Sequence, residues 1–529
     1  MRYLMLVALL GCDTGGDLGV PNGTATDGTG TSTTGTSTST NTDTTSTTPT
    51  GECSVSPTLQ VTALSDSSGV RATDVLVEVT LSESADLAVI CEATDDPNER
   101  HLVEGFGASS YSLKLQALLH DTTYVCQALP TCPASAEVPV SFEFTTGGIP
   151  SGLPQVVVET NPAYEPTPGY LLTQWKDRGG CGNDSVVVLY DTAGNLRWYQ
   201  TYPFGPTGTD TSVLIEGDQL VVGGAGVPNG VHFFDLWTGE SQVAAFPDTD
   251  DFHHDGKLLP DGRVMALFET VNRQGYPWIG FGLKTMDPLT GVVDWSYDSQ
   301  EGVDAGDLPL GGVRWDDTYH ANWMNWIEGP DGPTVYVSLC FAWQIIAIDP
   351  TTNEIKWNLG VDQDFALQDA SGASLDDSEF PQCQHGIEYR PEDQTLLVYD
   401  NGQARGQSSA SIYQLDEESM VATKLWNWTD PSGWREDTLG DIDWLDSGRV
   451  LITQAHAECW SWESAGDRSE IVEVDPETDE VWWRMRFTRP NDNIYRSERY
   501  NGCELFSSVT MCPERAERLN ELTPLLAGS

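Results

Sequence analysis

One pattern of apolar and polar positions recurs along residues 150–529. An apolar strand ends at an aspartate, a turn follows, and the next strand often carries tryptophan. The aspartates lie 44 to 67 residues apart. Repeats of this period that contain only strands predict a β-propeller, and six copies predict six blades. The copies are VVVLYDTAGNLRW (Asp191), VHFFDLWTGESQV (Asp235), LKTMDPLTGVVDW (Asp287), IIAIDPTTNEIKW (Asp349), SIYQLDEESMVATKLW (Asp416) and EIVEVDPETDEVWW (Asp475).

An inner hairpin precedes several of these outer ones. The segments are HHDGKLLPDGRVMALFET, HANWMNWIEGPDGPTVYVSLCFAW, QHGIEYRPEDQTLLVYDNG and GDIDWLDSGRVLITQAH. The residues before the first strand of a hairpin and after its second strand lie at the same end. We therefore expect one ring of polar side chains at a mouth of the central channel. Its members are His254, Glu269, His320, Cys340, His385, Asp400, Asn401, Asp441 and His456.

Residues 53–149 have a different pattern, with shorter strands at the spacing of a β-sandwich. The segments are DVLVEVTLSE, ADLAVICEA, YSLKLQAL, TTYVCQA and PVSFEFTTG. LLHDTTYVC, with Tyr124 two residues before Cys126, resembles the corner of fibronectin-type-III and immunoglobulin-like domains. The predicted fold class is therefore all-β, with a small sandwich before a six-bladed propeller at 150–529.

The first 52 residues resemble an export signal followed by a tether. Arg2 precedes a short apolar run that ends in Leu-Leu-Gly-Cys, which resembles the lipobox of bacterial lipoproteins. Residues 1–11 would be the signal peptide and Cys12 the lipidated N-terminus. The Thr/Ser/Gly tract of 12–52 cannot bury apolar surface and should be disordered. We expect a lipoprotein at the outer membrane, the cell surface or the periplasmic face of a membrane, attached only through its lipid.

Charge narrows the range of partners. The chain has 529 residues and a net charge of −54, from 80 acidic and 26 basic residues. Such a charge excludes nucleic acid and anionic lipid surfaces as partners. The length exceeds that of one domain. The sequence does not determine the oligomeric state.

The propeller region resembles the bacterial arylsulfate sulfotransferase family over most of residues 150–505. The motifs that carry this resemblance are HHDGKLLPDGR, HANWMNW, QHGIEY, YDNGQARG and IYRSER. The resemblance implies sulfuryl transfer between phenols without phosphoadenosine phosphosulfate. It also implies that His385 is the nucleophile and that His254 and His320 support it. The family has an arginine on the strand after the second histidine, where this chain has Cys340.

The chemistry of sulfuryl transfer requires a nucleophile, cations around the equatorial oxygens and an acid for the leaving phenolate. Neutral His385 could attack sulfur, and protonated His320 or His254 could bind the oxygens and protonate the leaving oxygen. No cofactor is expected, and the partners would be small phenols and aryl sulfates. Arg405 and Arg496 are candidates to replace the missing arginine. The full set of predicted substrate-binding residues is Arg405, Arg496, Asn401, His456 and Trp343.

Two other functions fit the same residues. Convergent histidines with a carboxylate nearby could hold zinc or copper. The propeller could also be a non-catalytic surface-binding module with a degenerate pocket, because a fold does not fix a function.

Cysteine count and placement predict three disulfides. With Cys12 lipidated, ten cysteines remain, an even number in an oxidising compartment. Cys340 follows one inner hairpin and Cys383 begins the next, so both should lie at the same mouth on adjacent blades. The predicted pairs are Cys340 with Cys383, Cys503 with Cys512, and Cys91 with Cys126.

The lipobox predicts how the protein is anchored. The mature chain should begin at lipidated Cys12 and partition into detergent. Cys12→Ala should release it into the aqueous phase, as measured by detergent phase separation. Equal membrane association of this variant would contradict the lipobox.

Overall fold

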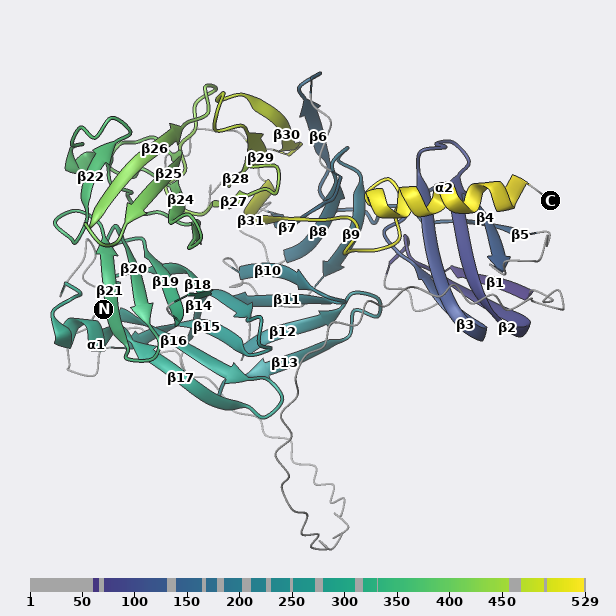
Figure 1. The fold of residues 1–529 in the computed structure, drawn as a ribbon, viewed down its shortest axis with the longest axis horizontal. Helices are drawn as coiled ribbons and strands as arrows, with labels where there is room; N and C mark the ends of the chain where they lie inside the picture. The colour runs from purple at the N-terminus through teal and green to yellow at the C-terminus, as the bar shows by residue number, and fades with distance from the viewer. Residues whose placement is uncertain are drawn as a thin grey trace, which may run out of the picture. The chain divides into compact units, whose positions relative to one another are not determined.

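The computed structural model is built almost entirely of β-strands (Figure 1). It describes residues 60–65, 71–130, 139–163, 168–177, 185–201, 211–224, 230–247, 251–271, 279–309, 317–330, 332–455, 468–489 and 492–527. The predicted signal peptide, the tether and His456 lie outside these residues. Two α-helices are present among them, α1 (Ser299–Ala305) and α2 (Pro513–Ala527). The expected all-β class is confirmed.

Six sheets of four or five strands are formed by the described residues from 156 to 500. The first three, in hydrogen-bonding order, are β10 (Thr211–Glu216), β11 (Gln219–Gly224), β12 (Gly230–Asp235) and β13 (Ser241–Ala245); β14 (Asp251–Leu258), β15 (Val264–Val271), β16 (Ile279–Asp287) and β17 (Val292–Asp298); and β18 (Ala321–Gly329), β19 (Gly332–Leu339), β20 (Gln344–Asp349) and β21 (Glu354–Leu359).

The other three sheets recruit strands that are distant in sequence. They are β22 (Ala366–Asp369), β26 (Val421–Trp428), β25 (Ser409–Asp416), β24 (Thr395–Asp400) and β23 (Ile387–Arg390); β27 (Asp441–Trp444), β28 (Val450–Gln454), β29 (Glu470–Val474), β30 (Val481–Phe487) and β6 (Val156–Thr160); and β31 (Asp492–Tyr500), β7 (Tyr170–Asp177), β8 (Ser185–Asp191) and β9 (Leu196–Thr201). A short 3-10 helix, Asp377–Glu379, lies between β22 and β23.

All six repeated segments form the antiparallel strand pairs that the pattern predicts, β8–β9, β12–β13, β16–β17, β20–β21, β25–β26 and β29–β30. The aspartate at each turn has a structural role. Asp235 Oδ1, for example, accepts hydrogen bonds from the backbone N–H groups of Trp237 (3.0 Å) and Thr238 (2.6 Å). Such a bond replaces a backbone partner at the tip of the hairpin and fixes the turn.

The first strands of the six sheets contact one another in a closed cycle. β10 contacts β14, β14 contacts β18, β23 contacts β27, and β31 contacts both β27 and β10. The remaining step is made by Asn322 in β18, whose Nδ2 donates to the carbonyl of Gln384, just before β23 (2.9 Å). The cycle closes through residues from both ends of this region, since the late strand β31 pairs with the early strand β7.

Apolar side chains fill the spaces between neighbouring sheets. One core contains Met265 and Leu283 of the β14–β17 sheet together with Val337 and Ile346 of the β18–β21 sheet, all fully buried. Packing of this kind keeps each sheet in a fixed orientation. The polar first strands are thereby held around a common axis.

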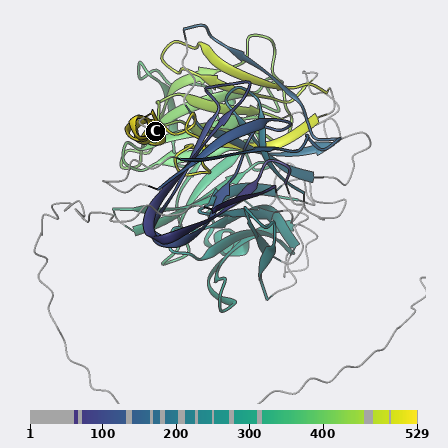
Figure 2. The same ribbon diagram turned by 90° about the vertical axis from the view of Figure 1, so that its right-hand side faces the viewer.

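The N-terminal β-unit has fewer and longer strands than expected. It consists of β1 (Gln60–Ser65), β2 (Val75–Ala93), β3 (Arg100–Leu115), β4 (Thr123–Pro130) and β5 (Val140–Thr145). DVLVEVTLSE and ADLAVICEA, expected as separate strands, both belong to β2, which curves along its length (Figure 2). Hydrogen bonds join all five strands in one sheet, in the order β1-β2-β4-β5 with β3 on the other side of β2. The prediction was wrong here because polar Ser82 and Glu83 continue the strand instead of ending it.

The last helix of the chain packs on this N-terminal unit. Leu519 and Leu522 of α2 share a core with Ala88, Ile90 and Leu102 of β2 and β3. Figure 1 shows α2 beside these strands. No helix among the described residues is long and apolar enough to cross a bilayer.

A buried ionic cluster joins the N-terminal unit to β9. Both oxygens of Glu99 accept hydrogen bonds from the guanidinium of Arg197, at 2.6 and 2.9 Å. Glu99 Oε1 also accepts from Tyr124 Oη (3.0 Å), which in turn accepts from Leu119 N (2.9 Å). His101 Nε2 lies 2.9 Å from the same carboxylate. Burial opposes the charge of Glu99, but the hydrogen bonds from His101 and Arg197 prevail and hold its pKa well below the usual range.

Removing this carboxylate should destabilise the protein. Glu99→Gln leaves Arg197 short of one buried partner, and breaking a buried ion pair in this way costs about 3–5 kcal/mol. The measurement is urea unfolding at pH 7. Because the pKa of Glu99 is depressed, its contribution is present above the ordinary pKa of 4.5 and is lost as the pH falls below it.

The matched control is Glu104→Gln. Glu104 pairs with Arg518, whose side chain is 39% exposed, and such a surface pair contributes at most about 1 kcal/mol. Equal effects of the two substitutions would show that the Glu99 cluster does not hold the units together.

Candidate active site

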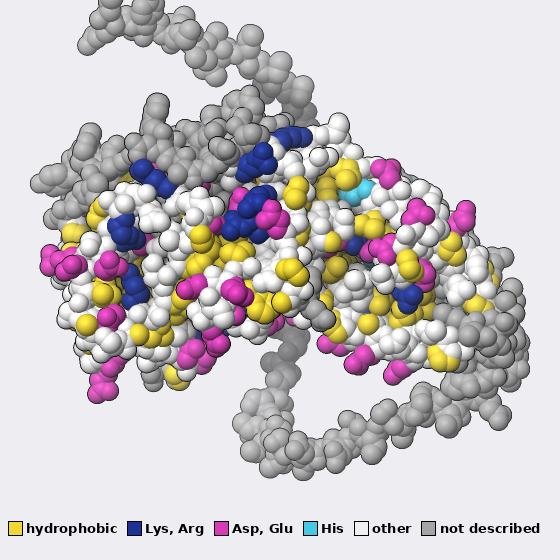
Figure 3. Space-filling model, turned by 90° about the horizontal axis from the view of Figure 1, so that it is seen from above, with side chains coloured by type: hydrophobic (Ala, Val, Ile, Leu, Met, Phe, Trp, Pro, Cys, Tyr) yellow, Lys and Arg dark blue, Asp and Glu magenta, His cyan; other side chains and the backbone are white. Residues whose placement is uncertain are grey.

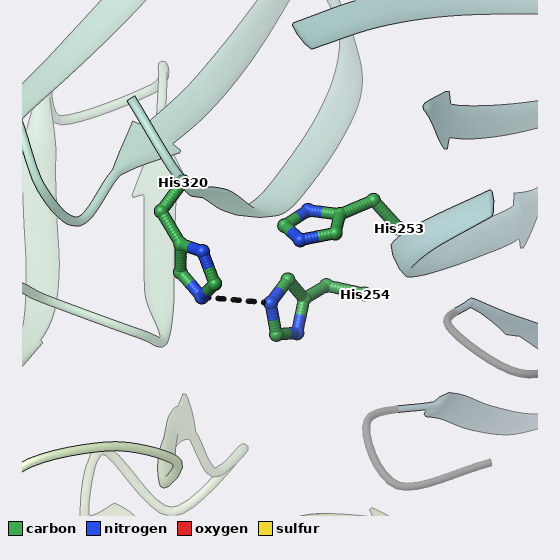
Figure 4. Close-up of side chains that lie close together, drawn as sticks. All are labelled: His253, His254 and His320. Carbon is green, nitrogen blue, oxygen red and sulfur yellow. Dashed lines mark hydrogen bonds between the residues drawn. The ribbon is translucent and has the colours of Figure 1, made fainter. Parts of the chain in front are cut away.

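Three histidines from different sheets converge in the channel. His254 lies in β14, His320 directly precedes β18, and His385 lies just before β23. The rings of His254 and His320 have centroids 4.8 Å apart, and those of His254 and His385 lie 6.4 Å apart. Figure 4 shows His253, the neighbour of His254, directed toward the same point. His254 and His385 are 3% and 1% exposed, so substrate would meet them only inside the channel.

Irregular backbone aims these side chains. The pairing register shifts between Phe252 and Gly256 in β14, between Ala321 and Trp323 in β18, and between Ile494 and Ser497 in β31. Bulges of this kind re-aim side chains next to active sites. The residues inside the three shifts include His253, His254, Asp255, Asn322, Tyr495 and Arg496.

Two of the histidines also have left-handed backbone. His254 has φ of 43° and His320 has φ of 48°. Such a conformation costs about 1–3 kcal/mol for a residue with a Cβ and persists only when the surroundings impose it. The sequence analysis placed His254 before its strand, but it lies within β14, in the bulge. A bulge cannot be read from the alternation of apolar residues.

Asn401 fixes the tautomer of His385. Its Nδ2 donates to the carbonyls of Glu436 and Leu439, both at 3.0 Å, so its Oδ1 must point the other way. That oxygen lies 2.6 Å from His385 Nδ1 and therefore accepts a proton from it. Nε2 of a neutral imidazole is then left with its lone pair.

His385 stays neutral over the physiological pH range. Burial lowers its pKa to about 3; the hydrogen bond to Asn401 opposes that shift, and the charges of His320 and Arg496 add to it. A neutral imidazole with a fixed, unprotonated Nε2 is a competent nucleophile.

His254 and His320 form a hydrogen-bonded chain with two groups that sequence reasoning missed. Asp317 Oδ2 accepts from His320 Nδ1 (2.5 Å), and His320 Nε2 lies 3.1 Å from His254 Nε2. His254 Nδ1 lies 3.3 Å from Tyr495 Oη. Phe341 stacks on the other face of His320, with ring centroids 4.4 Å apart. The chain can move a proton from Asp317 toward Tyr495.

The surroundings tune the charges in this chain. Burial lowers the pKa of His254 well below its usual value, and the neighbouring histidines and Arg496 add to the shift. Burial opposes ionisation of Asp317, but its hydrogen bond from His320 outweighs burial and lowers the pKa of the carboxyl. A charged carboxylate beside His320 favours a proton on that ring.

Arg496 provides the positive charge beside the histidines. Its Nη1 lies 3.2 Å from Asp255 Oδ1, and its Nη2 donates to the carbonyl of Asn322 (2.5 Å) and to Tyr495 Oη (3.2 Å). Burial lowers its pKa, but Asp255 and Tyr495 outweigh this and raise it above the ordinary value, so the guanidinium remains charged.

The other predicted binding residues have different environments. Arg405 pairs with Asp400 and donates to the carbonyls of Ser378 (2.8 Å) and Phe380 (3.1 Å), so its guanidinium supports a loop instead of facing the histidines. The prediction that Arg405 replaces the missing cation is therefore not supported by its contacts. Trp343 packs against the bonded cysteines beside the site. His456 lies outside the described residues.

All three predicted cysteine pairs are bonded in the structure: Cys91–Cys126, Cys340–Cys383 and Cys503–Cys512. Cys340 precedes Phe341, which stacks on His320, while the carbonyl of Cys383 lies 3.3 Å from His385 Nδ1. The Cys340–Cys383 bond therefore connects the segments that hold two of the histidines. Cys340 stands where the resemblance placed an arginine, and Arg496 supplies a cation from β31.

Comparison with known proteins identifies the family. The family model of the arylsulfotransferases (ASST) matches residues 170–496, more than half of the chain, and the chain belongs to this family. The protein is accordingly a sulfotransferase-like enzyme, and membership supports aryl sulfotransferase activity in general. No curated protein matches the chain.

Solved structures give only distant likenesses. TolB from Acinetobacter baumannii is 10% identical with a TM-score of 0.40, covering 73% of this chain and 81% of that chain. A quinonprotein alcohol dehydrogenase-like protein from Bacteroides thetaiotaomicron is 10% identical with a TM-score of 0.33, covering 80% and 94%.

The disulfide beside the site should stabilise the protein. Cys340 and Cys383 are 43 residues apart and Cys503 and Cys512 are 9 apart. Because the longer loop loses more entropy when closed, replacing the first pair by serine should cost about 4 kcal/mol, against about 2.6 kcal/mol for the second. Urea unfolding of the two double variants makes this comparison, and equal losses would contradict it.

Non-reducing peptide mapping tests the connectivity itself. It should recover one linked peptide that contains Cys340 and Cys383. Free, alkylatable thiols at either position would contradict the bond.

Proposed function

We propose that the protein transfers a sulfuryl group from an aryl sulfate to a phenol through a sulfohistidine on His385, without phosphoadenosine phosphosulfate. The observation that carries the proposal is the hydrogen bond from His385 Nδ1 to Asn401 Oδ1, which leaves Nε2 unprotonated. The family match supports aryl sulfate and phenol as the general substrate classes. The scaffold we infer is a six-bladed propeller, on the strength of the six sheets and the closed cycle of first strands.

In the first half-reaction, the lone pair of His385 Nε2 attacks sulfur. The S–O bond to the aromatic ring breaks and a phenolate leaves. The chain of His320 and His254 supplies the proton that this oxygen takes up, while Arg496 stabilises the negative charge on the sulfuryl oxygens. In the second half, an acceptor phenol returns a proton to the chain, its oxygen attacks sulfur, and the N–S bond breaks.

Burial explains how such an acidic protein can accept an anion. Acidic side chains are spread over the face shown in Figure 3, where water and salt screen them within about 8 Å. Arg496 is 4% exposed, so its charge acts on the site at close range and with little screening.

The sulfohistidine predicts a covalent label. Brief exposure to a chromogenic aryl sulfate should add one sulfuryl group to the peptide that contains His385, detectable by mass spectrometry. His385→Asn should abolish both the label and phenol release, whereas His120→Asn, a histidine outside the channel, should retain both. Asn401→Ala should slow labelling by about 10- to 100-fold, as expected for loss of a residue that orients a reactive group. Phenol release without a label would remove His385 as the nucleophile.

The same label has a predicted pH dependence. A nucleophilic histidine loses activity as the pH falls through its pKa, which for His385 is about 3. Labelling in a single turnover should therefore not fall through protonation of His385 between pH 8 and pH 5. A loss centred near the ordinary pKa of 6.5 would contradict a buried neutral nucleophile.

A metal site is the second candidate function. Nitrogen atoms of His253, His254 and His320 lie within 4.8 Å of one another, close enough to bind one ion. Neutral imidazoles are zinc and copper ligands. Stoichiometric metal in the purified protein, lost in His320→Ala, would favour this function. A folded protein with neither turnover nor metal would favour the third reading, a non-catalytic surface-binding module.

We further propose that the protein is a membrane-anchored lipoprotein. The support is the Leu-Leu-Gly-Cys segment at residues 9–12 and the Thr/Ser/Gly tract after it. Small phenols would reach a channel held outside the membrane by such a tether.

A further inference from the structure

A second polar chamber lies in the channel, further along the first strands than the histidines. This chamber, called here the channel cavity, has a volume of about 250 Å³. Its walls include Lys257, Trp323, Glu388, Asp441, Asp443 and Glu498. Arg496, which also lines it, contacts Tyr495 on the histidine side. The proposed sulfuryl transfer uses none of these carboxylates.

Three carboxylates meet in this cavity. Oxygens of Asp441, Asp443 and Glu498 lie within 4.8 Å of one another. Calcium binds oxygen at about 2.3–2.6 Å, so oxygens on opposite sides of one ion are separated by at most about 5 Å. The three side chains therefore have the spacing that a single hard cation requires. The volume also leaves room for water molecules to complete the coordination.

Nearby cations do not balance these charges. Glu388 already accepts a hydrogen bond from Trp444 N (2.6 Å) and lies 3.7 Å from Arg390. The guanidinium of Arg496 is paired with Asp255. Among the described residues that line the cavity, Lys257 is the other cation, and its ammonium sits over the ring of Trp323.

Two of the carboxylates also lack ordinary partners. Asp441 is 3% exposed and faces the cavity, yet no described side chain donates a hydrogen bond to it. Asp443 Oδ2 is sealed from solvent and has no hydrogen-bond partner among the described residues. A buried carboxylate without a partner is costly, and nearby like charges increase the cost. Such a group requires either a proton or a cation.

We propose that Asp441, Asp443 and Glu498 bind a hard divalent cation of the calcium type in the channel cavity. Oxygen-only ligands select calcium over zinc or copper, which the histidine cluster would prefer. The cation would neutralise the carboxylates beneath Arg496, leaving the positive charge of Arg496 available to the histidine side of the channel. The binding itself does not depend on sulfuryl transfer.

Terbium luminescence tests the site directly, because Trp323 and Trp444 line the cavity and can sensitise a bound Tb³⁺ ion. The full chain, stripped with EDTA, should show saturable emission at one equivalent of Tb³⁺, and Ca²⁺ should displace it. Asp443→Asn with Glu498→Gln should weaken Tb³⁺ binding at least tenfold. His385→Asn should bind Tb³⁺ normally, which separates this result from the outcome for sulfuryl transfer.

The matched control is Glu240→Gln with Glu477→Gln, two exposed positions that carry the same change in charge. This control should bind Tb³⁺ like the unmodified chain. Equal binding by the cavity variant and the control would overturn the proposal, as would emission that does not saturate.

Crystals soaked in Tb³⁺ provide a measurement that needs no variant. The proposal expects an anomalous peak between Asp441, Asp443 and Glu498. Peaks confined to the histidines or to the protein surface would overturn it.

Discussion

The buried ion pair between Arg496 and Asp255 is the interaction on which the channel depends. It joins β31 to β14 across the axis, with Nη1 and Oδ1 3.2 Å apart. Both residues lie within bulges, and the same bulges hold Tyr495 and His254. Two charges removed from water must find each other with good geometry or the fold loses several kcal/mol. Satisfying this pair therefore sets where β31 sits and places a cation beside the histidines.

Burial, more than net charge, determines the chemistry of the site. The chain carries a charge of −54, yet the histidines respond mainly to the loss of water and to a few near groups. His385 is neutral because hydration of an imidazolium is unavailable to it, and Asn401 then selects which nitrogen keeps the proton. An exposed histidine would share neither property, since water would solvate either form and either tautomer.

The N-terminal β-unit is integrated with the sheets through buried charge. Glu99 is satisfied by Arg197 from β9, and α2 from the far end of the chain covers β2 and β3. A linker of independent domains would leave such groups to water. Here the carboxylate is 4% exposed, so separation would leave charges without partners. This arrangement makes the first and last parts of the described chain one structural element.

The sequence by itself determined the six outer strand pairs and the end of the channel at which the histidines lie. Both follow from local rules: an aspartate closes its own turn, as Asp235 does, and a hairpin returns to the end where it began. Tertiary structure alone decided which cation serves the site. Arg405 is nearer in sequence to Asn401, yet Asp400 takes its charge, and Arg496 reaches the histidines from a late strand. Bulges and pairs across sheets depend on packing between distant segments, for which no local pattern exists.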